Sequence, residues 1–316
     1  MASQDMSAQP ARGLGKARPE SRFRQWRDRN EEIIAAWSFL GPGFLGWIFF
    51  IGLPTVAAFV LAFYRYNLLG VPKFVGLRNF EKLLRDDVFH AALYNTVVFT
   101  VATVFLSVVV GLLLALLTDR VLKGFVFLRS MLLLPYVVIM AGVAAVFRFI
   151  YLPERGLIDG LLGLFGVDGP NWLTSETWAM PALIILSVWK GFGYNMILFI
   201  VGLQNVPPSL YEAAKIDGAS AWTRFWYVTL PMLSPTMFFV IVISVIGSFQ
   251  VFDQAYLMTN GGPGTATTTL VMYIYQLGFK NFDMGYASAV ALVLFAVVFL
   301  FSAAQFTLQK RWVHYD

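Results

Sequence analysis

The residues of this sequence that could do chemistry are few, and they favour binding over catalysis. The chain has no cysteine and only two histidines, so a thiolate site or a histidine-rich metal centre has almost no ligands to draw on. No G-x-x-x-x-G-K-[ST] phosphate loop occurs, so the chain has no phosphate cradle with which to hydrolyse ATP. What remains is a small set of hydroxyl, amine and aromatic groups in apolar surroundings, which could hydrogen-bond a polar solute.

Two pairs of polar residues carry this interpretation. Lys190 and Tyr194 are four residues apart, so they share one helical face, and Ser244 and Ser248 share a face of a later segment, where Gly247 leaves room for close approach. Polar groups inside a bilayer are costly and usually face a bundle interior or a water-filled path. Alternative roles stay open, namely hydrogen bonds between helices for the serines, core packing for the tyrosine, and an ion pair with Asp253 for the lysine.

The elements that would position these residues are membrane-spanning helices. Hydrophobic residues make up 58% of the chain and charged residues 13%, a balance that a soluble domain rarely has. Six apolar runs reach or approach the ~20 residues needed to cross a bilayer. They are 33–64, 91–118, 130–147, 178–203, 225–252 and 284–309. We therefore expect an all-α membrane protein with six transmembrane helices, in preference to a bundle of six soluble core helices, which are usually shorter and keep one polar face.

The distribution of Lys and Arg predicts the orientation. Connections assigned to the inner side carry about twice as many of them as the outer connections, mostly because of the N-terminal tail, and positive charges tend to stay in the cytoplasm. Both termini are therefore expected in the cytoplasm. Residues 1–30 are basic and poor in apolar side chains, which predicts a disordered cytoplasmic tail, and 31–316 would form the transmembrane domain. A nucleic-acid partner has no basic, aromatic-interleaved surface to support it.

The inner loop 204–235 contains residues that typically start and end helices, in the order expected of a helix-turn-helix. Ser209 is expected as an N-cap with Glu212 completing a capping box, and Gly218 as the left-handed terminator of the first helix. Ser220 would cap a second short helix, until Pro231 stops or bends it. The aromatic residues Trp222, Phe225 and Trp226 would lie on one side of that second helix.

This loop resembles the cytoplasmic signature of binding-protein-dependent ABC importer permeases. The family pattern reads E-A-A, three residues, G, nine residues, an aliphatic residue, one residue, then L-P, and every spacing is kept here, with Val228 at the aliphatic position. The resemblance implies a type I ABC importer permease fold whose loop is a coupling helix seated on an ATPase subunit. The residues expected to couple to the ATPase are Glu212, Ala213, Ala214, Asp217, Gly218, Leu230 and Pro231.

Weaker motifs are similar to those of the sugar-transporting, maltose-type branch of this family. They are Val75–Phe80, Asn95-Thr96, Leu134–Tyr136, Asn195–Leu198 and Thr259–Pro263. That branch holds its sugar midway across the membrane. Carried over residue by residue, and with Lys190 differing in chemistry from the family, the resemblance implies a substrate site at Tyr136, Lys190, Gly191, Tyr194, Ser244, Gly247 and Ser248.

The same resemblance implies the partners and the location. We expect a multi-pass subunit of the bacterial inner membrane that pairs with a second homologous permease subunit, two ATPase subunits and an extracytoplasmic solute-binding protein. No cofactor is expected in this chain, because ATP and Mg²⁺ would bind the ATPase subunits. The substrate would be a carbohydrate, with glycerol phosphate or another polar solute left open. A stand-alone ion-coupled secondary transporter is the alternative of another class. Such proteins commonly need acidic residues in the membrane to carry protons or sodium, and Asp253 is the one carboxylate in an expected span.

Overall fold

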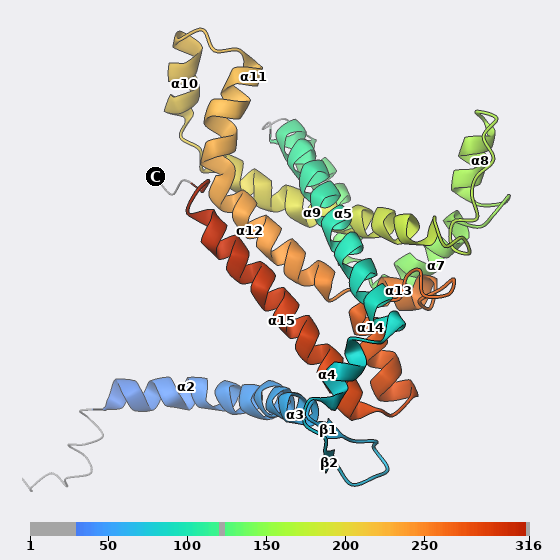
Figure 1. The fold of residues 1–316 in the computed structure, drawn as a ribbon. Coiled ribbons are helices and arrows are strands. Elements are labelled where there is room, and N and C mark those ends of the chain that lie inside the picture. Colours follow the sequence, from blue (N-terminus) through green and yellow to red (C-terminus); the bar gives the residue numbers. More distant parts are fainter. Residues whose placement is uncertain (1–29, 120–123, 314–316) are drawn as a thin grey trace, which may run out of the picture. The chain divides into compact units, whose positions relative to one another are not determined.

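The computed structural model of the chain describes residues 30–119 and 124–313 (Figure 1). The expected tail lies outside this range apart from residue 30, so the division into a tail and one transmembrane domain stays a prediction. The chain divides into two compact units, residues 1–57 and 58–316. In the first unit and across its boundary, one helical run continues through α2 (Glu31–Trp47), the π-helical segment η1 (Ile48–Gly52) and α3 (Leu53–Leu61). This run is long and apolar enough to cross a membrane.

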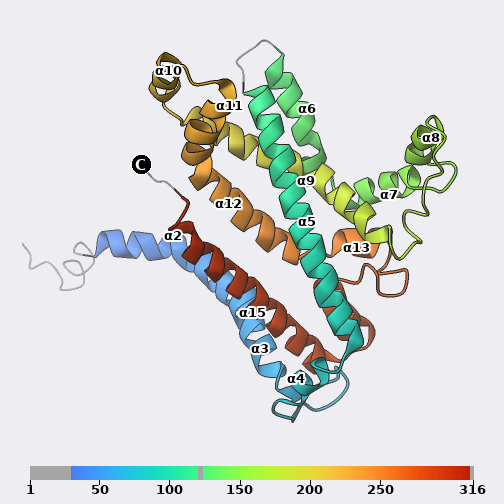
Figure 2. The same ribbon diagram turned by 45° about the horizontal axis from the view of Figure 1, so that its top comes forward.

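The second unit is built around long helices. Its elements are β1 (Tyr64–Arg65), β2 (Lys73–Phe74), α4 (Arg78–Leu83), α5 (Asp87–Thr118), α6 (Phe125–Val137), α7 (Met140–Ile150), α8 (Leu157–Gly163), α9 (Ala179–Gln204), α10 (Pro208–Ile216), α11 (Ala221–Arg224), η2 (Phe225–Thr229), α12 (Leu230–Phe249), α13 (Asp253–Met258), α14 (Leu270–Tyr275), η3 (Gln276–Lys280) and α15 (Met284–Gln309). The two short strands pair antiparallel. Helix α9 packs against α5 and α6, and α12 packs against α5, α9 and α15 (Figure 2).

Glycines allow these helices to approach closely. A Cβ atom on Gly111 of α5 would lie 2.8 Å from the Asn195 side chain of α9, and one on Gly193 of α9 would lie 2.2 Å from the Leu132 carbonyl oxygen of α6. Neither position could hold a larger residue without moving a neighbouring helix. Small residues at helix interfaces are typical of membrane bundles, where packing replaces the hydrophobic effect as the driving force for association.

The number of candidate spans is consistent with the six expected, but the third is not the single helix that was expected from the 130–147 run. The described residues contain five helices long and apolar enough to cross a membrane, or up to six if the pair Val126–Val137 and Met140–Ile150 counts as one. This pair is bent by 96°. Val138 and Ile139 between the two helices have extended backbone, and Pro135 has no N–H to continue the α6 hydrogen-bond pattern.

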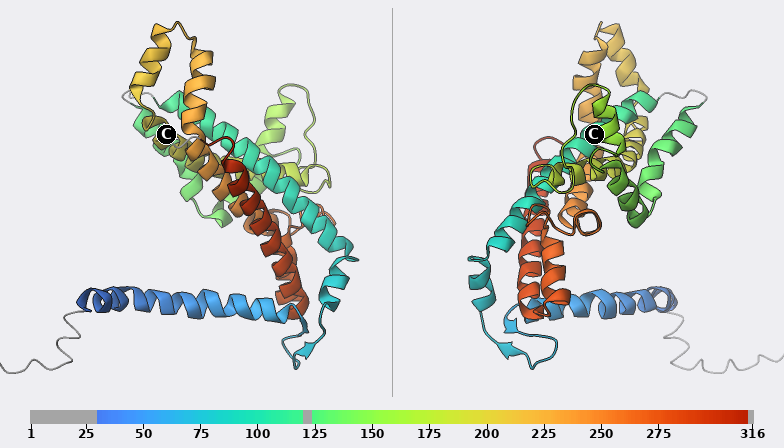
Figure 3. Two further views of the ribbon diagram at one scale, coloured as in Figure 1. Left: turned by 60° about the vertical axis from the view of Figure 1, so that its left-hand side comes forward. Right: turned by 90° about the vertical axis from the view of Figure 1, so that its right-hand side faces the viewer.

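The α10–α11 hairpin lies at one end of the second unit. Figure 3 shows it projecting beyond the neighbouring helices, at the end where α5 finishes, α6 begins and α15 finishes. The strands and α4 lie at the opposite end. This arrangement agrees with a hairpin that shares one side of a membrane with the end of α5, the start of α6 and the end of α15.

The opposite end is held together by Asp86, the residue before α5. One carboxylate oxygen accepts hydrogen bonds from the backbone amides of Val88 and Phe89, 3.0 and 3.1 Å away. The other accepts from the hydroxyls of Tyr273 on α14 and Tyr286 on α15. Asp86 therefore caps α5 and joins it to two helices that follow almost two hundred residues later.

Candidate functional site

The α10–α11 hairpin begins differently from the sequence prediction. Helix α10 starts at Pro208, with Pro207 in the N-cap position and no side-chain cap, so the prediction that Ser209 caps the helix and forms a capping box with Glu212 is wrong. Proline suits the first helical position because its fixed φ matches a helix and its missing N–H would have no partner there. Ser209 instead lies within the first turn of α10.

The turn between the two helices is as predicted. Gly218 has a φ of +75°, in the left-handed region, and the Ala219 amide reaches back to the Ala214 carbonyl at 2.9 Å, which closes the helix end. Ser220 caps α11, because its Oγ accepts a hydrogen bond from the Thr223 amide at 3.1 Å. The predicted helix-turn-helix is therefore present.

Pro231 does not stop the second helix. The chain passes from α11 through the π-helical segment η2 into α12, so that Ala221–Phe249 form one run of 29 residues. A proline inside a helix removes one hydrogen bond and crowds the preceding turn, and the wider turn at η2 relieves this crowding without a break. The hairpin is braced by the Tyr211 hydroxyl, 3.1 Å from Thr229 Oγ1.

The seven expected coupling residues lie in two groups. Glu212, Ala213, Asp217 and Gly218 are exposed on α10 and the turn, with Ala214 half-buried beside them, whereas Leu230 and Pro231 are half-buried at the base of α12. Ile216 is 86% exposed and Trp222 is 70% exposed. Trp222, Phe225 and Trp226 form the expected aromatic cluster, with ring centroids 5.4 to 6.0 Å apart.

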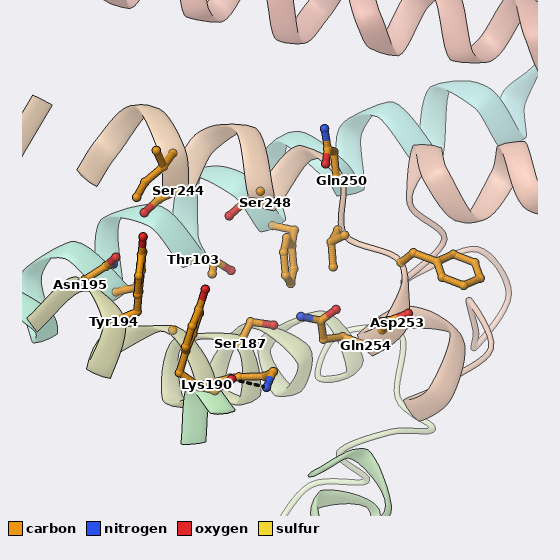
Figure 4. A pocket seen from close by; sticks show the side chains of 18 residues that line it. Thr103, Ser187, Lys190, Tyr194, Asn195, Ser244, Ser248, Gln250, Asp253 and Gln254 are labelled. Carbon is orange, nitrogen blue, oxygen red and sulfur yellow. Dashed lines mark hydrogen bonds between the residues drawn. The ribbon is translucent and has the colours of Figure 1, made fainter. Parts of the chain in front are cut away.

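The seven expected substrate residues line one cavity of about 560 Å³ between α5, α6, α9 and α12. Ser244 and Ser248 on α12 lie across the cavity from Lys190 on α9 (Figure 4). The sequence interpretation missed further polar residues in the wall, namely Thr103, Ser107, Ser187, Asn195, Gln250 and Gln254. A signal for the first two was present, because Thr96, Thr100, Thr103 and Ser107 recur at helical spacing along α5 and are all buried.

The lysine of the cavity binds backbone carbonyls. Lys190 Nζ donates to the carbonyl oxygens of Pro135, Tyr136 and Val138 at 3.2, 3.2 and 2.7 Å. The alternative of an ion pair with Asp253 does not form, since among the described residues the pair at salt-bridge distance is Lys82–Asp283, 3.7 Å apart.

Two tyrosines form an aromatic platform in the same wall. The rings of Tyr136 on α6 and Tyr194 on α9 are stacked, with centroids 4.7 Å apart and planes 13° from parallel. Tyr136 is 48% exposed. Gly191 and Gly247 leave the wall open, because a Cβ atom on either would meet nothing within 4 Å.

Two features agree with the comparisons with known proteins. One is the hairpin with the permease signature at the end of an apolar helix bundle, and the other is the polar cavity within that bundle. Residues 104–314 match the family of binding-protein-dependent transport system inner membrane components. The chain belongs to that family. It is therefore an inner-membrane permease subunit of an ABC transporter, as the signature in the hairpin implied, and the ion-coupled alternative is set aside.

Relatives of this permease subunit, and a solved structure with the same fold, align over most of the chain. The probable ABC transporter permease protein YurN of Bacillus subtilis is 36% identical over 281 residues, 87% of this chain and 96% of the relative. The sn-glycerol-3-phosphate transport system permease protein UgpA of Brucella abortus is 37% identical, covering 90% and 97%. The arabinooligosaccharides transport system permease protein AraP of Bacillus subtilis is 36% identical, covering 88% and 89%. A crystal structure of a bacterial alginate importer has the same fold, with a TM-score of 0.79 at 24% identity over 91% of this chain and 99% of that one.

Proposed function

We propose that this permease subunit imports a carbohydrate, delivered by an extracytoplasmic binding protein, through the cavity between α5, α6, α9 and α12. ATP hydrolysis takes place on separate ATPase subunits, which also hold the ATP and Mg²⁺. A second, homologous permease subunit completes the membrane-spanning pair. The arabinooligosaccharide and glycerol-phosphate permeases among the relatives support a polyhydroxylated substrate.

The cavity is the observation that carries this proposal. Sugars present hydroxyl groups around their edge and apolar C–H groups on their faces, so they suit a wall that combines hydrogen-bonding groups with aromatic rings. Here Ser244 and Ser248 supply hydroxyls opposite the stacked rings of Tyr136 and Tyr194. Gly191 and Gly247 leave room for the sugar ring, because neither glycine has a side chain to fill the cavity.

The α10–α11 hairpin is proposed as the docking element for an ATPase subunit. Its exposed Glu212 and Asp217, together with the apolar Ile216 side chain, form a surface that a partner could cover. In this proposal the hairpin and both termini are cytoplasmic. The binding protein then docks at the opposite end, near β1, β2 and α4.

Reconstitution of the complete complex tests the proposal. Substrate-stimulated ATP hydrolysis and uptake should be lost in the double variant Glu212→Ala, Gly218→Pro, while the complex still inserts into the membrane. Ser209→Ala, an exposed change on the same helix, is the matched control and should retain both activities. Wild-type rates of uptake and ATP hydrolysis in the double variant would refute the docking role of the hairpin. If no sugar of a broad panel stimulates ATP hydrolysis, the proposal that the substrate is a carbohydrate is refuted.

A further inference from the structure

The bend between α6 and α7 leaves backbone carbonyls that α6 cannot satisfy. The last four carbonyls of any α-helix lack partners within the helix. In α6 the Val138 amide reaches the Leu134 carbonyl at 3.3 Å, but the carbonyls of Pro135 and Tyr136 lie beyond the last helical amides. In an apolar environment each such group left alone is costly, and the aligned carbonyls give the helix end a partial negative charge.

Lys190 supplies the missing donors from the neighbouring helix. An ammonium group has three N–H donors and no acceptor, and Nζ has three carbonyl partners, on Pro135, Tyr136 and Val138, at 3.2, 3.2 and 2.7 Å. The hydrogen-bonding capacity of this lysine is thereby filled. Its positive charge also lies against the negative end of α6, where a cation is stabilised.

The same helix holds the end of α6 at a second point. Tyr194, one turn after Lys190, stacks on the ring of Tyr136. The backbone of Tyr136 is therefore bound by Lys190 and its ring by Tyr194, both on α9. Gly193, between them, lets α9 approach the backbone of α6 at Leu132. These contacts fix the aromatic platform relative to α9.

We propose that Lys190 is a positioning residue, which holds Tyr136 on its platform by capping the broken helix, and that the cavity accepts an uncharged polyhydroxylated substrate. Among the described residues that line the cavity, the charged side chains are Lys190 and Asp253. The three N–H donors of Lys190 already bind backbone carbonyls, and the carboxylate of Asp253 repels anions. The remaining polar groups are hydroxyls and amides, which pair with neutral sugars. This inference rests on the proposed function for the substrate and on geometry alone for the lysine.

The role of the lysine is tested without any substrate, because the chain has no cysteine and a single one can be introduced. Met140, the first residue of α7, is 8% exposed, so a cysteine there reacts with a thiol reagent only when the bend opens. In the full complex, Lys190→Met should speed labelling of Met140→Cys by about tenfold, which corresponds to ~1.4 kcal/mol. Lys190→Arg, which keeps several donors, should restore slow labelling.

Two controls make this result specific. Ala115→Cys, buried on α5 near the hairpin end, should label at the same slow rate in both backgrounds, and Lys73→Met, an exposed lysine on β2, should leave the labelling of Met140→Cys unchanged. Co-purification of the partner subunits shows that the variants assemble. An unchanged labelling rate at Met140→Cys in Lys190→Met would overturn the positioning role.

The substrate class is tested with three probes in reconstituted complex, namely arabinotriose, glycerol 3-phosphate and an alginate trisaccharide. The neutral sugar should stimulate wild-type ATP hydrolysis and the two anions should not. Lys190→Met should raise the half-saturating concentration of arabinotriose several-fold, and Lys190→Arg should restore it toward the wild-type value. Stimulation by an anion that Lys190→Met abolishes would overturn the proposal. If no sugar of the broad panel stimulates either, the proposed carbohydrate substrate fails, and the labelling experiment still decides the role of Lys190.

Discussion

Two buried threonines on α5 differ in one respect that matters for binding. The side-chain hydroxyls of Thr100 and Thr103 have no hydrogen-bond partner among the described residues, and both residues are more than nine-tenths buried. Thr103 lines the cavity and Thr100 does not. An unpaired buried hydroxyl costs free energy in the empty protein, so a partner supplied by a bound solute would be favoured at Thr103.

Thr103→Val, which keeps the shape and removes the hydroxyl, should therefore weaken substrate binding. A neutral hydrogen bond contributes ~0.5–1.5 kcal/mol, so the half-saturating concentration for substrate-stimulated ATP hydrolysis should rise by about 2- to 12-fold. Thr100→Val is the matched control and should leave it unchanged. Equal effects of the two substitutions would show that the hydroxyl acts through packing of α5.

The carboxylate of Asp86 is a second residue whose setting predicts a measurable effect. Burial raises the pKa of this carboxyl, but hydrogen bonds from Tyr273 and Tyr286 and from the amides of Phe89 and Val88 outweigh burial and leave the pKa below its ordinary value. The charged form is therefore favoured by folding. Its contribution to stability is present above the pKa of the unfolded chain and is lost as the pH falls through the lower pKa of the folded protein.

Asp86→Asn should lower the thermal stability of the purified complex at pH 7. Asparagine still caps α5, but the charge-assisted bonds to the two tyrosines are lost, at a cost of ~1–3 kcal/mol. The gap to wild type should begin to narrow as the pH drops below about 4, the ordinary pKa of an aspartate in the unfolded chain, and should close only as the pH falls through the lower pKa of the folded protein. Asp87→Asn, an exposed neighbour, should change little, and a gap that stays constant with pH would contradict the account.

At the scale of elements, the contact between α9 and α6 depends on a glycine. A Cβ atom on Gly193 would lie 2.2 Å from the Leu132 carbonyl oxygen, which is backbone and cannot rotate away, whereas one on Gly191 would meet nothing within 4 Å. The two glycines are on the same helix, two residues apart. They separate the packing of α9 from the shape of the cavity.

Gly193→Ala should push α9 away from α6 and lower the stability of the complex by ~1–3 kcal/mol, the usual cost of overpacking, which thermal unfolding in detergent can measure. Gly191→Ala should leave stability close to wild type but reduce substrate-stimulated ATP hydrolysis, because its methyl group enters the cavity. If Gly191→Ala unfolds the complex as readily as Gly193→Ala, the assignment of Gly191 to an open wall is wrong.

The elements also show which features the sequence could predict. Apolar runs located α5, α9 and α15 within a few residues, because length and hydropathy decide whether a helix can span a bilayer. The bend after α6 was missed, since the 130–147 run stays apolar through it and the donors that stabilise it come from Lys190, some fifty residues later. Of the two outcomes expected at Pro231, a stop or a bend, the stop is excluded, because a π-helical turn can absorb a proline that would end an ordinary helix.

The site divides in the same way. The hairpin turn at Gly218 and the cap at Ser220 could be predicted, since both depend on neighbouring residues. Helical spacing indicated five of the seven substrate residues, and the family resemblance added Tyr136 and Gly191. The structure gathers all seven in one cavity, but their contact with substrate stays a prediction. Thr103 and the Asp86 cluster were missed, because the threonine's setting depends on α9 and α12, and the two tyrosines that bind Asp86 come from the last quarter of the chain.

At the scale of the whole molecule, the proposed orientation can be tested with single cysteines in the cysteine-free chain. Leu69, between β1 and β2, is 97% exposed, and Lys310, directly after α15, is also exposed. Leu69→Cys should react with a membrane-impermeant maleimide in spheroplasts, and Lys310→Cys only after permeabilisation. Labelling of both from the same side would require an even number of spans between them and would contradict the proposed orientation.

The unbroken run from α11 through η2 to α12 has a mechanical consequence. Its 29 residues, Ala221–Phe249, make a strut of roughly 43 Å at ~1.5 Å per residue. One end of this strut is half of the hairpin, and the other carries Ser244 and Ser248. A tilt of the hairpin must therefore also move Ser244 and Ser248. Bending at the wider turn of η2 would reduce the movement that reaches these two serines.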